Sequence, residues 1–334
     1  LTAVRHTKAA AAAAEPVYWG SEASDPVQRV PLPVTVAVYS HKGEHKLHAN
    51  EDRYFHAADF GKEVLGKSKQ LSALHEASQA LGADRGLPAN SFFGVYDGHG
   101  GSAAAASAAS RLHLLLASDP ETWREAPKAA LLEAFRLLEA ELRASYSKDK
   151  DKADRSGACA LATLLRGHRL FVHSVGDCRA VILRGPDHAQ PYTQLTTDMR
   201  ATYAPEAQRI AQVGGKISDG RVWGGLIPSR TLGDFPWKDK GPGLIATPEE
   251  VELEVTPDVK YLVMGSDGLF DVLPNKTISR IVGRMNSNAQ KVCNELVKEV
   301  KKRPGQDDIT LMVVQFCHLD VAKVSSPSPK PSPK

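Results

Sequence analysis

Short runs of apolar residues, rich in β-branched and aromatic side chains, predict the strands of this chain. The first three runs are residues 34–39 (VTVAVY), 53–57 and 91–96 (SFFGVY). Further strands are predicted at 158–165, 169–175, 179–183, 261–265 and 309–316. Only short turns separate 158–165, 169–175 and 179–183, so we expect these three strands to form an antiparallel meander.

A second pattern, with apolar positions every three or four residues, predicts helices. It is clearest over residues 122–146, where Ala130, Ala134 and Leu138 fall on one face. Other helices are predicted within 61–88, 100–116, 205–213, 278–285 and 289–302. Two helices follow the first strands and two precede the last. This order favours an α+β fold, a four-layer α-β-β-α sandwich of two antiparallel sheets flanked by helix pairs.

The chain divides into one large folded domain and two terminal segments. Residues 1–30 are expected to be a loosely attached N-terminal arm, and 31–318 the folded domain. Residues 319–334 contain a run of Ser, Pro and Lys that predicts a disordered tail. Residues 198–243 are expected to be mostly irregular, and a long irregular stretch inside a compact domain usually serves a function.

Composition excludes some classes of partner. The 42 Lys and Arg nearly balance the 39 Asp and Glu, for a formal charge of +3, so bulk charge supplies no affinity for nucleic acid or a membrane surface. No run approaches the ~18 apolar residues of a membrane-spanning helix, so no membrane insertion is expected. The four cysteines have no zinc-ligand spacing and are predicted to be reduced packing residues, which suits a reducing compartment. A cytoplasmic or nuclear location and a monomeric chain are expected.

Acidic residues follow several of the predicted strands directly. Asp97 comes after the apolar run 92–96 and precedes Gly98, while Asp267 comes after 261–265 and precedes Gly268. A carboxylate at the end of a buried strand, with a glycine that lets a backbone carbonyl approach, suits a hard divalent cation. One Asp-Gly pair alone is typical of a turn, whereas the repeated pairing with buried strands favours a metal site.

Other acids are expected to lie close to the same site. Asp177 follows Gly176 in a predicted turn, Asp307 and Asp308 precede the last strand, and Glu51 and Asp52 precede the second. Several unpaired carboxylates packed together repel one another, so a bound cation or large pKa shifts must compensate.

Six motifs in this sequence resemble a known family. They are NEDR (50–53), YDGHGG (96–101), SVGDCRA (174–180), IPSRTLGD (227–234), MGSDGLFD (264–271) and DDITLMVV (307–314). Their content and order are similar to those of the metal-dependent Ser/Thr protein phosphatases of type 2C, over roughly residues 34–316. The resemblance implies the same sandwich fold, a catalytic domain at 31–318, and a flap beside the active site at about 197–222.

The resemblance also implies an activity and its cofactors. Two Mg²⁺ or Mn²⁺ ions would share a bridging water that attacks phosphoserine or phosphothreonine monoesters in phosphoprotein substrates, with His99 as the general acid. The implied metal residues are Glu51, Asp52, Asp97, Gly98 through its carbonyl, Asp267 and Asp307. With Asp267, the acids Asp177 and Asp271 would hold a weaker third ion.

The sequence departs from the family pattern where an arginine usually binds the substrate phosphate. That position is Leu47, and the neighbouring Lys46 is the candidate replacement, as a point charge without the planar fork of arginine. A second departure is Asp308, where asparagine is common.

Further roles are expected in the flap and just after it. Candidate substrate contacts in the flap are Tyr203, Arg209, Lys216 and Arg221, although each is also typical of a plain surface residue. Arg230 and Asp234 are expected to form a structural ion pair.

Two alternatives to an active phosphatase remain at this point. Leu47 raises the hypothesis of a non-catalytic relative that binds a phosphoprotein as a regulator. A different two-metal hydrolase, such as a nuclease, would require a basic substrate groove, which the nearly neutral net charge does not supply.

Overall fold

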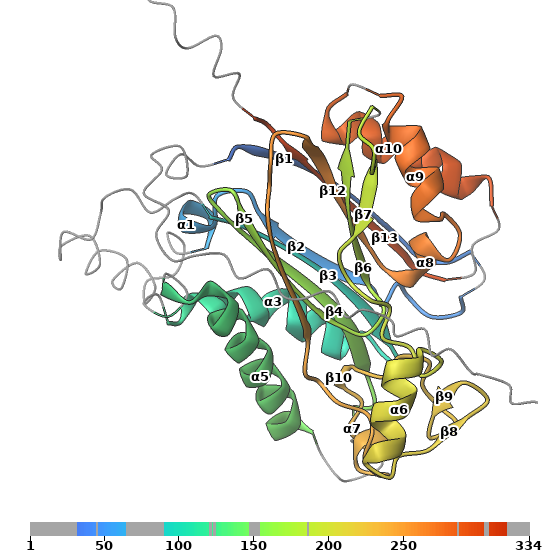
Figure 1. The fold of residues 1–334 in the computed structure, drawn as a ribbon. Coiled ribbons are helices and arrows are strands. Elements are labelled where there is room, and N and C mark those ends of the chain that lie inside the picture. The colour runs from blue at the N-terminus through green and yellow to red at the C-terminus, as the bar shows by residue number, and fades with distance from the viewer. Residues whose placement is uncertain are drawn as a thin grey trace, which may run out of the picture.

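The computed structural model describes most of the predicted domain. The described residues are 32–44, 46–64, 90–119, 122, 125–146, 154–185, 187–285, 287–303 and 307–318. Two β-sheets pack face to face with helices on both outer surfaces, as predicted (Figure 1). The expected N-terminal arm, the expected tail and most of the helix predicted within 61–88 lie outside the described residues.

The first sheet has five strands and is antiparallel throughout. Its order is β1 (Val34–His41), β13 (Ile309–Phe316), β12 (Val259–Gly265), β6 (Arg179–Arg184) and β7 (Tyr192–Gln194). The last strand therefore pairs with the first along its whole length, from Val34 opposite Phe316 to His41 opposite Ile309. This pairing brings the acids that precede β13 next to the loop that follows β1.

The second sheet is also antiparallel. Its order is β11 (Glu249–Glu254), β5 (Arg169–Val175), β4 (Gly157–Arg166), β3 (Asn90–His99) and β2 (Arg53–Ala57), and the short β10 (Leu232–Gly233) pairs with β4. Strand β3 continues through the motif that contains Asp97 and His99. The register places Asp97 opposite Cys159 and His99 opposite Gly157.

The predicted meander is wrong in its third strand. Strands β4 and β5 pair as expected, but β6 pairs with β12 in the other sheet. Gly176, between β5 and β6, has a φ of 94°, a left-handed conformation that favours glycine and redirects the chain. The chain thus crosses from one sheet to the other at Gly176, and Asp177 lies at the crossing.

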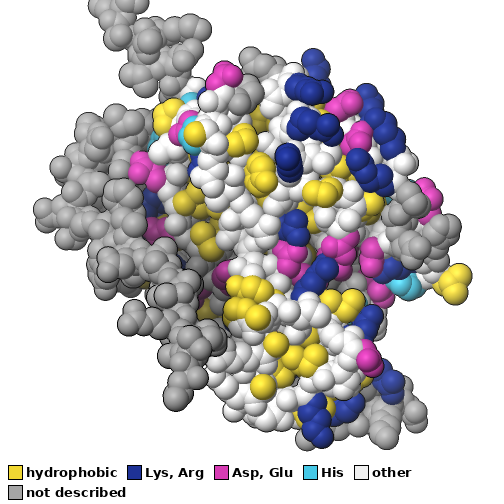
Figure 2. Space-filling view, turned by 45° about the vertical axis from the view of Figure 1, so that its right-hand side comes forward, with side chains coloured by type: hydrophobic (Ala, Val, Ile, Leu, Met, Phe, Trp, Pro, Cys, Tyr) yellow, Lys and Arg dark blue, Asp and Glu magenta, His cyan; other side chains and the backbone are white. Residues whose placement is uncertain are grey.

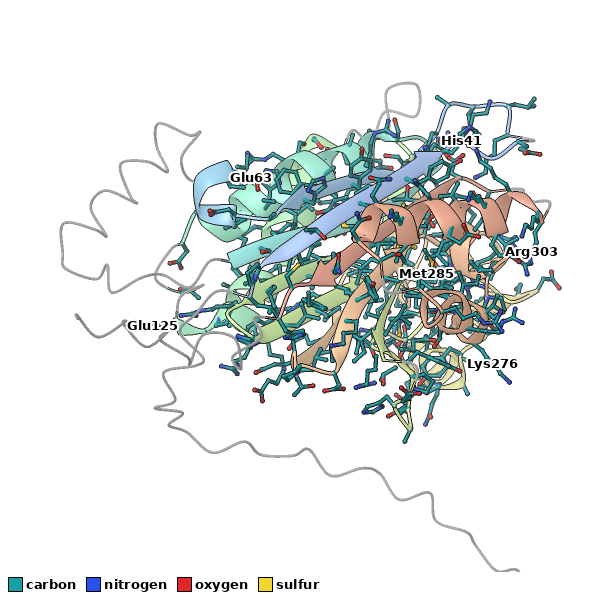
Figure 3. All side chains as sticks on the ribbon, turned by 90° about the horizontal axis from the view of Figure 1, so that it is seen from above. His41, Glu63, Glu125, Lys276, Met285 and Arg303 are labelled. Atoms are coloured by element: carbon teal, nitrogen blue, oxygen red, sulfur yellow. The ribbon has the colours of Figure 1, made fainter. Side chains whose placement is uncertain are left out.

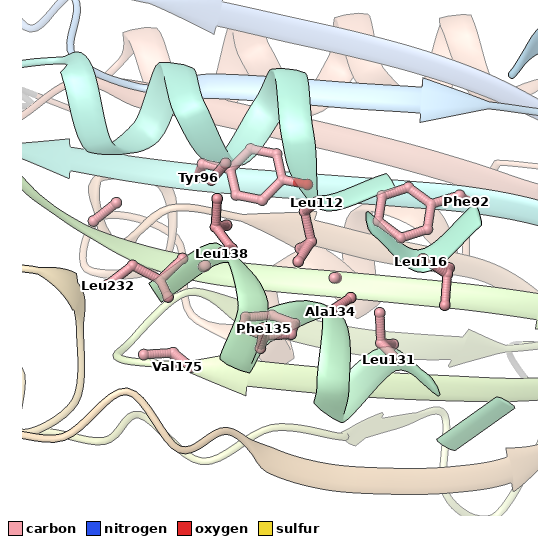
Figure 4. Close-up of a cluster of buried hydrophobic side chains, with 14 of the residues drawn as sticks. Phe92, Tyr96, Leu112, Leu116, Leu131, Ala134, Phe135, Leu138, Val175 and Leu232 are labelled. Atoms are coloured by element: carbon pink, nitrogen blue, oxygen red, sulfur yellow. The ribbon is translucent and has the colours of Figure 1, made fainter. Parts of the chain in front are cut away.

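Helices α3 (Ala103–Ala117) and α5 (Pro127–Ser145) cover the second sheet, with the short α1 (Phe60–Glu63) nearby. Their apolar faces pack with Phe92 and Tyr96 of β3 in one buried cluster, which Figure 4 shows around Phe135 and Leu138. Helix α5 begins at Pro127, later than the predicted residue 122. Proline lacks a backbone N–H and has a fixed φ, so it suits the first turn of a helix.

Helices α9 (Asn275–Val282) and α10 (Ala289–Lys301) lie against the first sheet, and the short α8 (Asp267–Phe270) follows β12. A separate apolar cluster fills the space between the two sheets. Seen from above, His41 lies with Arg303 and Lys276 at the end of the molecule opposite Glu63 and Glu125 (Figure 3). None of the helices that the structure describes has the length and apolar character needed to cross a membrane.

The stretch 198–243 is more ordered than predicted. It contains α6 (Ala204–Gln212), α7 (Phe235–Lys238) and a small hairpin of β8 (Ile217–Ser218) and β9 (Arg221–Val222). A small apolar cluster that includes Ile210 and Val222 packs inside it. Strands too short to show a period of two are not detectable from the sequence pattern.

One buried histidine under α5 lacks hydrogen-bond partners. His173 on β5 has no exposed surface, neither ring nitrogen has a partner, and its ring stacks on Phe135 at a centroid distance of 6.2 Å. Burial lowers its pKa to about 4; the charge of Lys128 lowers it further and that of Glu250 opposes the shift. An unfolded histidine titrates near pH 6.5, so the unfolded chain takes up this proton first, and stability should fall as the pH drops from about 6.5 towards 4.

We therefore expect His173→Phe to weaken the acid sensitivity of the fold. Between pH 7 and pH 5, the free energy of unfolding of the variant should fall by about 2 kcal/mol less than that of the wild type. Urea titrations at the two pH values measure this difference. His56→Phe, at an exposed position on β2, is the matched control and should behave as wild type. Equal pH slopes in all three proteins would contradict the assignment.

Candidate metal centre

Three aspartates from distant parts of the sequence meet at one end of the sandwich. One carboxylate oxygen each of Asp97, Asp177 and Asp267 lies within 4.8 Å of the others. Asp97 comes from β3 in the second sheet, Asp267 opens α8 after β12 of the first sheet, and Asp177 lies where the chain crosses between sheets. The two sheets together therefore form the cluster.

Close backbone packing holds this end of the sandwich together. A Cβ atom on Gly98 would lie 2.5 Å from the carbonyl oxygen of Glu51, and one on Gly268 would collide with the carbonyl oxygen of Asp308. Only glycine permits these approaches. They place the segments around Glu51 and Asp308 directly against the strand and helix that carry Asp97 and Asp267.

The clustered carboxylates are electrostatically unfavourable without a cation. Burial raises the pKa of Asp97 well above its usual range, and the charges of Asp52, Asp267, Asp177 and Asp307 raise it further. Burial, again with neighbouring aspartates, raises the pKa of Asp267 to about 7. A divalent ion would lower the pKa of each of these groups, because opposite charge favours the ionised form.

Asp52 provides a second indication of a missing partner. It is 2% exposed; its Oδ2 accepts a hydrogen bond from Ser266 Oγ at 2.8 Å, and its Oδ1 has no partner. Burial raises its pKa to about 6. An unpartnered buried oxygen is rare in folded proteins. The donor set consists of oxygens alone, so the residues present fit Mg²⁺ or Mn²⁺ and do not resemble a zinc site.

The carboxylate of Asp308 binds backbone N–H groups beside the site. Its Oδ1 accepts from the backbone N–H of Gly43 at 2.8 Å, and its Oδ2 accepts from that of Glu51 at 2.8 Å. Both oxygens are needed as acceptors, whereas an asparagine has only one. This explains the aspartate at a position where the resemblance leads one to expect asparagine. Glu51 in turn accepts from the backbone N–H of Gly101 at 2.8 Å.

His99 lies two residues beyond Asp97 on the same strand and is oriented by Asp234. The Nε2 of His99 is 2.7 Å from Oδ2 of Asp234, which is 1% exposed. Burial lowers the pKa of the imidazole, but the hydrogen bond and charge of Asp234, with Asp177 and Glu51, outweigh burial and raise it above its usual range. Asp234 therefore favours the protonated form of the ring and holds its Nε2 side.

Lys46 reaches the same end of the molecule. Its ammonium forms an ion pair with Oδ1 of Asp307. Burial lowers its pKa, but Asp307, Asp308 and Asp97 together raise it above the usual value, so the side chain carries a full charge. Leu47 is fully exposed, at 102% of its reference surface. The cation of this loop is thus one residue away from the position where the family usually has arginine.

The comparison with protein families agrees with this geometry. The family model described as Protein phosphatase 2C matches residues 58–309. The chain belongs to the protein phosphatase 2C family. "Probable protein phosphatase 2C 47" of Oryza sativa subsp. japonica is 35% identical over 255 residues, which cover 71% of this chain and 62% of that protein.

Other family members show the same likeness over a similar range. "Integrin-linked kinase-associated serine/threonine phosphatase 2C" of Bos taurus is 30% identical over 248 residues, 68% of this chain and 66% of that protein. The crystal structure of serine-threonine phosphatase 2C from Toxoplasma gondii superposes with a TM-score of 0.65 at 20% identity, over 86% of this chain and 98% of that one. The structural likeness shows the phosphatase 2C fold. The chain spans about two thirds of the length of the curated relatives it matches.

The structure gives the flap residues other partners than the predicted substrate. Arg209 donates to Glu206 at 2.8–3.0 Å, Lys216 lies over the ring of Trp223, and Arg221 donates to the carbonyl of Gly225. Tyr203 is 40% exposed. None of these contacts involves the acidic cluster, so their proposed role in substrate binding stays a prediction.

The predicted ion pair between Arg230 and Asp234 is wrong. Arg230 donates to Oε1 of Glu206 at 2.7 Å, while Asp234 binds His99. Glu206 is 3% exposed, and burial alone would raise its pKa. Hydrogen bonds from Arg230, Arg209 and Ser229 outweigh burial and lower the pKa to about 2. Glu206 comes from α6, so spacing within the 227–234 motif could not reveal this partner.

Two site residues were not identified from the sequence. Asp234 was recognised only as part of a motif, and the left-handed backbone at this position, with a φ of 54°, gives no sequence signal beyond the preceding glycine. Arg200 contacts the acidic cluster directly, yet it stands in a segment without periodicity. Its only local signal is a position in the flap shortly after Asp198.

Proposed function

We propose that this chain is a metal-dependent protein phosphatase that hydrolyses phosphoserine and phosphothreonine monoesters. The observation that carries the proposal is the convergence of Asp97, Asp177 and Asp267, with His99 at the end of the same strand as Asp97. Family membership supports the reaction class. The expected cofactors are two Mg²⁺ or Mn²⁺ ions.

The residues that would hold the ions are Asp97, Asp267 and Asp307, with the carbonyl of Gly98. In this proposal, Glu51 and the unpartnered Oδ1 of Asp52 accept hydrogen bonds from water bound to the ions. When bound, the ions lower the pKa of coordinated water towards neutrality and offset the charge of the phosphoryl oxygens.

His99 performs the proton transfer in this proposal. The alkoxide of serine or threonine is a poor leaving group and must be protonated as it departs. Because Asp234 already binds Nε2, the proton passed to the leaving oxygen comes from Nδ1. Asp234 fixes the ring orientation and keeps the imidazole protonated until the transfer.

The decisive experiment is an assay of phosphothreonine peptide hydrolysis at millimolar Mn²⁺ and Mg²⁺, and in excess EDTA. We expect turnover with either ion and none in EDTA. Calorimetric titration of metal-free protein measures ion uptake independently of turnover. Folded protein that takes up no divalent ion, or takes it up without any hydrolysis, would overturn the proposed activity.

A second candidate function follows from Leu47. Without the arginine fork, the chain would bind a phosphoprotein and act as a regulator with little turnover. This alternative predicts saturable binding of phosphothreonine peptide with no product. The ion pair of Lys46 with Asp307 favours the active phosphatase, because it keeps a cation at the site.

Replacing Lys46 tests its role with the substrate phosphate. We expect Lys46→Ala to raise the KM for a phosphothreonine peptide by about tenfold, which corresponds to one lost charged hydrogen bond, with a smaller change in kcat. Lys46→Arg, which supplies a planar fork, should keep KM at or below the wild-type value. Lys42→Ala, at an exposed position in the same loop, is the matched control. An unchanged KM in Lys46→Ala would discard the role.

Substrates, oligomeric state and location complete the proposal. We propose phosphoproteins as substrates, a monomeric chain without nucleic-acid partners, and a cytoplasmic or nuclear location. Gel filtration of the full chain tests the oligomeric state, and a single species at the monomer mass is expected.

A further inference from the structure

Arg200 lies among three of the clustered carboxylates. Its Nε is 2.8 Å from Oδ2 of Asp177, and its Nη2 is 3.3 Å from Oδ2 of Asp267 and 3.1 Å from Oδ1 of Asp271. The Arg200 side chain is 25% exposed, and that of Asp177 only 3%. One guanidinium therefore contacts three acids that come from two different segments, and it supplies a single positive charge among them. Figure 2 shows a face of the molecule on which Asp and Glu side chains are interspersed with Lys and Arg.

The backbone fixes Arg200 in this position. Its neighbours Met199 and Ala201 are buried, at 6% and 1% exposure, and anchor the segment in the protein. The N–H of Met199 donates to the carbonyl of Gly176 at 2.9 Å, and the N–H of Ala201 donates to that of Ile227 at 2.8 Å. The first of these bonds ties Arg200 to the turn that carries Asp177.

The contacts of Arg200 use the same oxygens that a further cation would need. Asp177 has both oxygens occupied, since Oδ1 also accepts from Cys159 Sγ at 3.1 Å. Asp271 accepts from Arg200 through both of its oxygens. An arginine remains charged at all relevant pH values. A divalent ion bound by Asp177 and Asp271 would therefore have to displace a guanidinium and would be repelled by it at short range.

We propose that Arg200 is a built-in cation that closes the third-ion position, so that this chain binds two divalent ions instead of three. The inference rests on the proposed function and narrows it. Arg200 is a positioning residue here: it occupies the carboxylates of Asp177 and Asp271 and also contacts Oδ2 of Asp267, so the two ions would be held by Asp97, Asp307 and the other oxygen of Asp267.

The number of bound ions tests this directly. Metal-free full chain is titrated with Mn²⁺, and free aqueous Mn²⁺ is counted by its electron paramagnetic resonance signal. We expect two ions in the wild type and three in Arg200→Ala and Arg200→Gln. Arg200→Lys, which keeps the charge, should stay at two. Arg221→Gln removes one positive charge from the same flap without touching the acids, and it should also stay at two.

Thermal melting in EDTA provides a second readout. Arg200→Gln should melt below the wild type, because three carboxylates lose their counter-ion, and saturating Mn²⁺ should restore more stability to this variant than to the wild type. Arg200→Gln retains the length of the side chain, so it covers the case in which Arg200→Ala fails to fold.

The outcomes separate this inference from the proposed function. Three ions in the wild type, or two in both Arg200→Ala and Arg200→Gln, would overturn the role of Arg200 and leave the two-ion phosphatase intact. No ion in the wild type would overturn both. Two ions in every variant with a raised KM for substrate would assign the guanidinium to substrate binding and overturn the proposal.

Discussion

Asp97→Asn should lower turnover of a phosphothreonine peptide by more than about 10³-fold and remove tight uptake of Mn²⁺. The reason is the central place of Asp97: burial and four neighbouring aspartates act on its pKa, and it is the proposed ligand common to both ions. The same variant should be more stable than the wild type in EDTA, because a neutral amide replaces a carboxyl group whose ionised form burial and the neighbouring aspartates disfavour. Steady-state kinetics, calorimetry and melting in EDTA measure the three effects.

The opposite signs of these effects make the prediction sharp. A misfolded variant would lose activity and stability together. A folded variant that lacks only a metal ligand would lose activity but gain stability in the absence of metal. Asp187→Asn, which removes the same charge from an exposed turn, should change neither turnover nor ion uptake. Retained turnover in Asp97→Asn would remove Asp97 from the metal centre.

His99→Gln should lower kcat for phosphothreonine peptide by about 10²- to 10⁴-fold, the range for loss of a general acid. With p-nitrophenyl phosphate the loss should be much smaller, because nitrophenolate departs without a proton. The ratio of the two losses isolates the proton transfer from any general damage to the site. Equal losses with both substrates would contradict the role of His99 as acid.

The pH profile tests how Asp234 acts through His99. Burial lowers the pKa of His99, while the hydrogen bond and charge of Asp234 raise it, with a net rise. A general acid must be protonated, so activity on the peptide should fall as the pH rises through this pKa. Asp234→Asn keeps a polar side chain that tolerates the left-handed backbone, yet removes the charge, so the falling limb should move to lower pH. If the falling side of the pH profile does not move in Asp234→Asn, Asp234 has only a structural role.

Local sequence patterns predicted most of the elements and the layer order. The α+β sandwich is confirmed, because long amphipathic helices and β-branched runs carry strong periodic signals, as in α10 and β13. The sheet that β6 joins was predicted wrongly. Alternation or a continuous apolar run shows that a strand is buried but does not show which strand lies beside it. Strand β11 was missed because its sequence, EEVELE, reads as a charged segment.

The site was predictable to the extent that its residues stand in motifs. Asp97, Asp177 and Asp267 were named from the sequence, and the structure brings them together. The side chains that contact these motif residues could not be predicted from the sequence in the same way. His99 and Asp234 are 135 positions apart, and Arg200 meets Asp271 across 71. Such pairings depend on how the two sheets are superposed, which no local pattern encodes.

The crossing at Gly176 and the pairing of β13 with β1 mean that each sheet contributes part of one charged cage. Ions bound there would act as a non-covalent cross-link between the two halves of the sandwich. Amide hydrogens of β3 and β12, far apart in sequence, should therefore slow their exchange together when Mn²⁺ is added. Chelation would then loosen the sandwich as a whole, and metal supply would control the lifetime of the folded chain as well as its turnover.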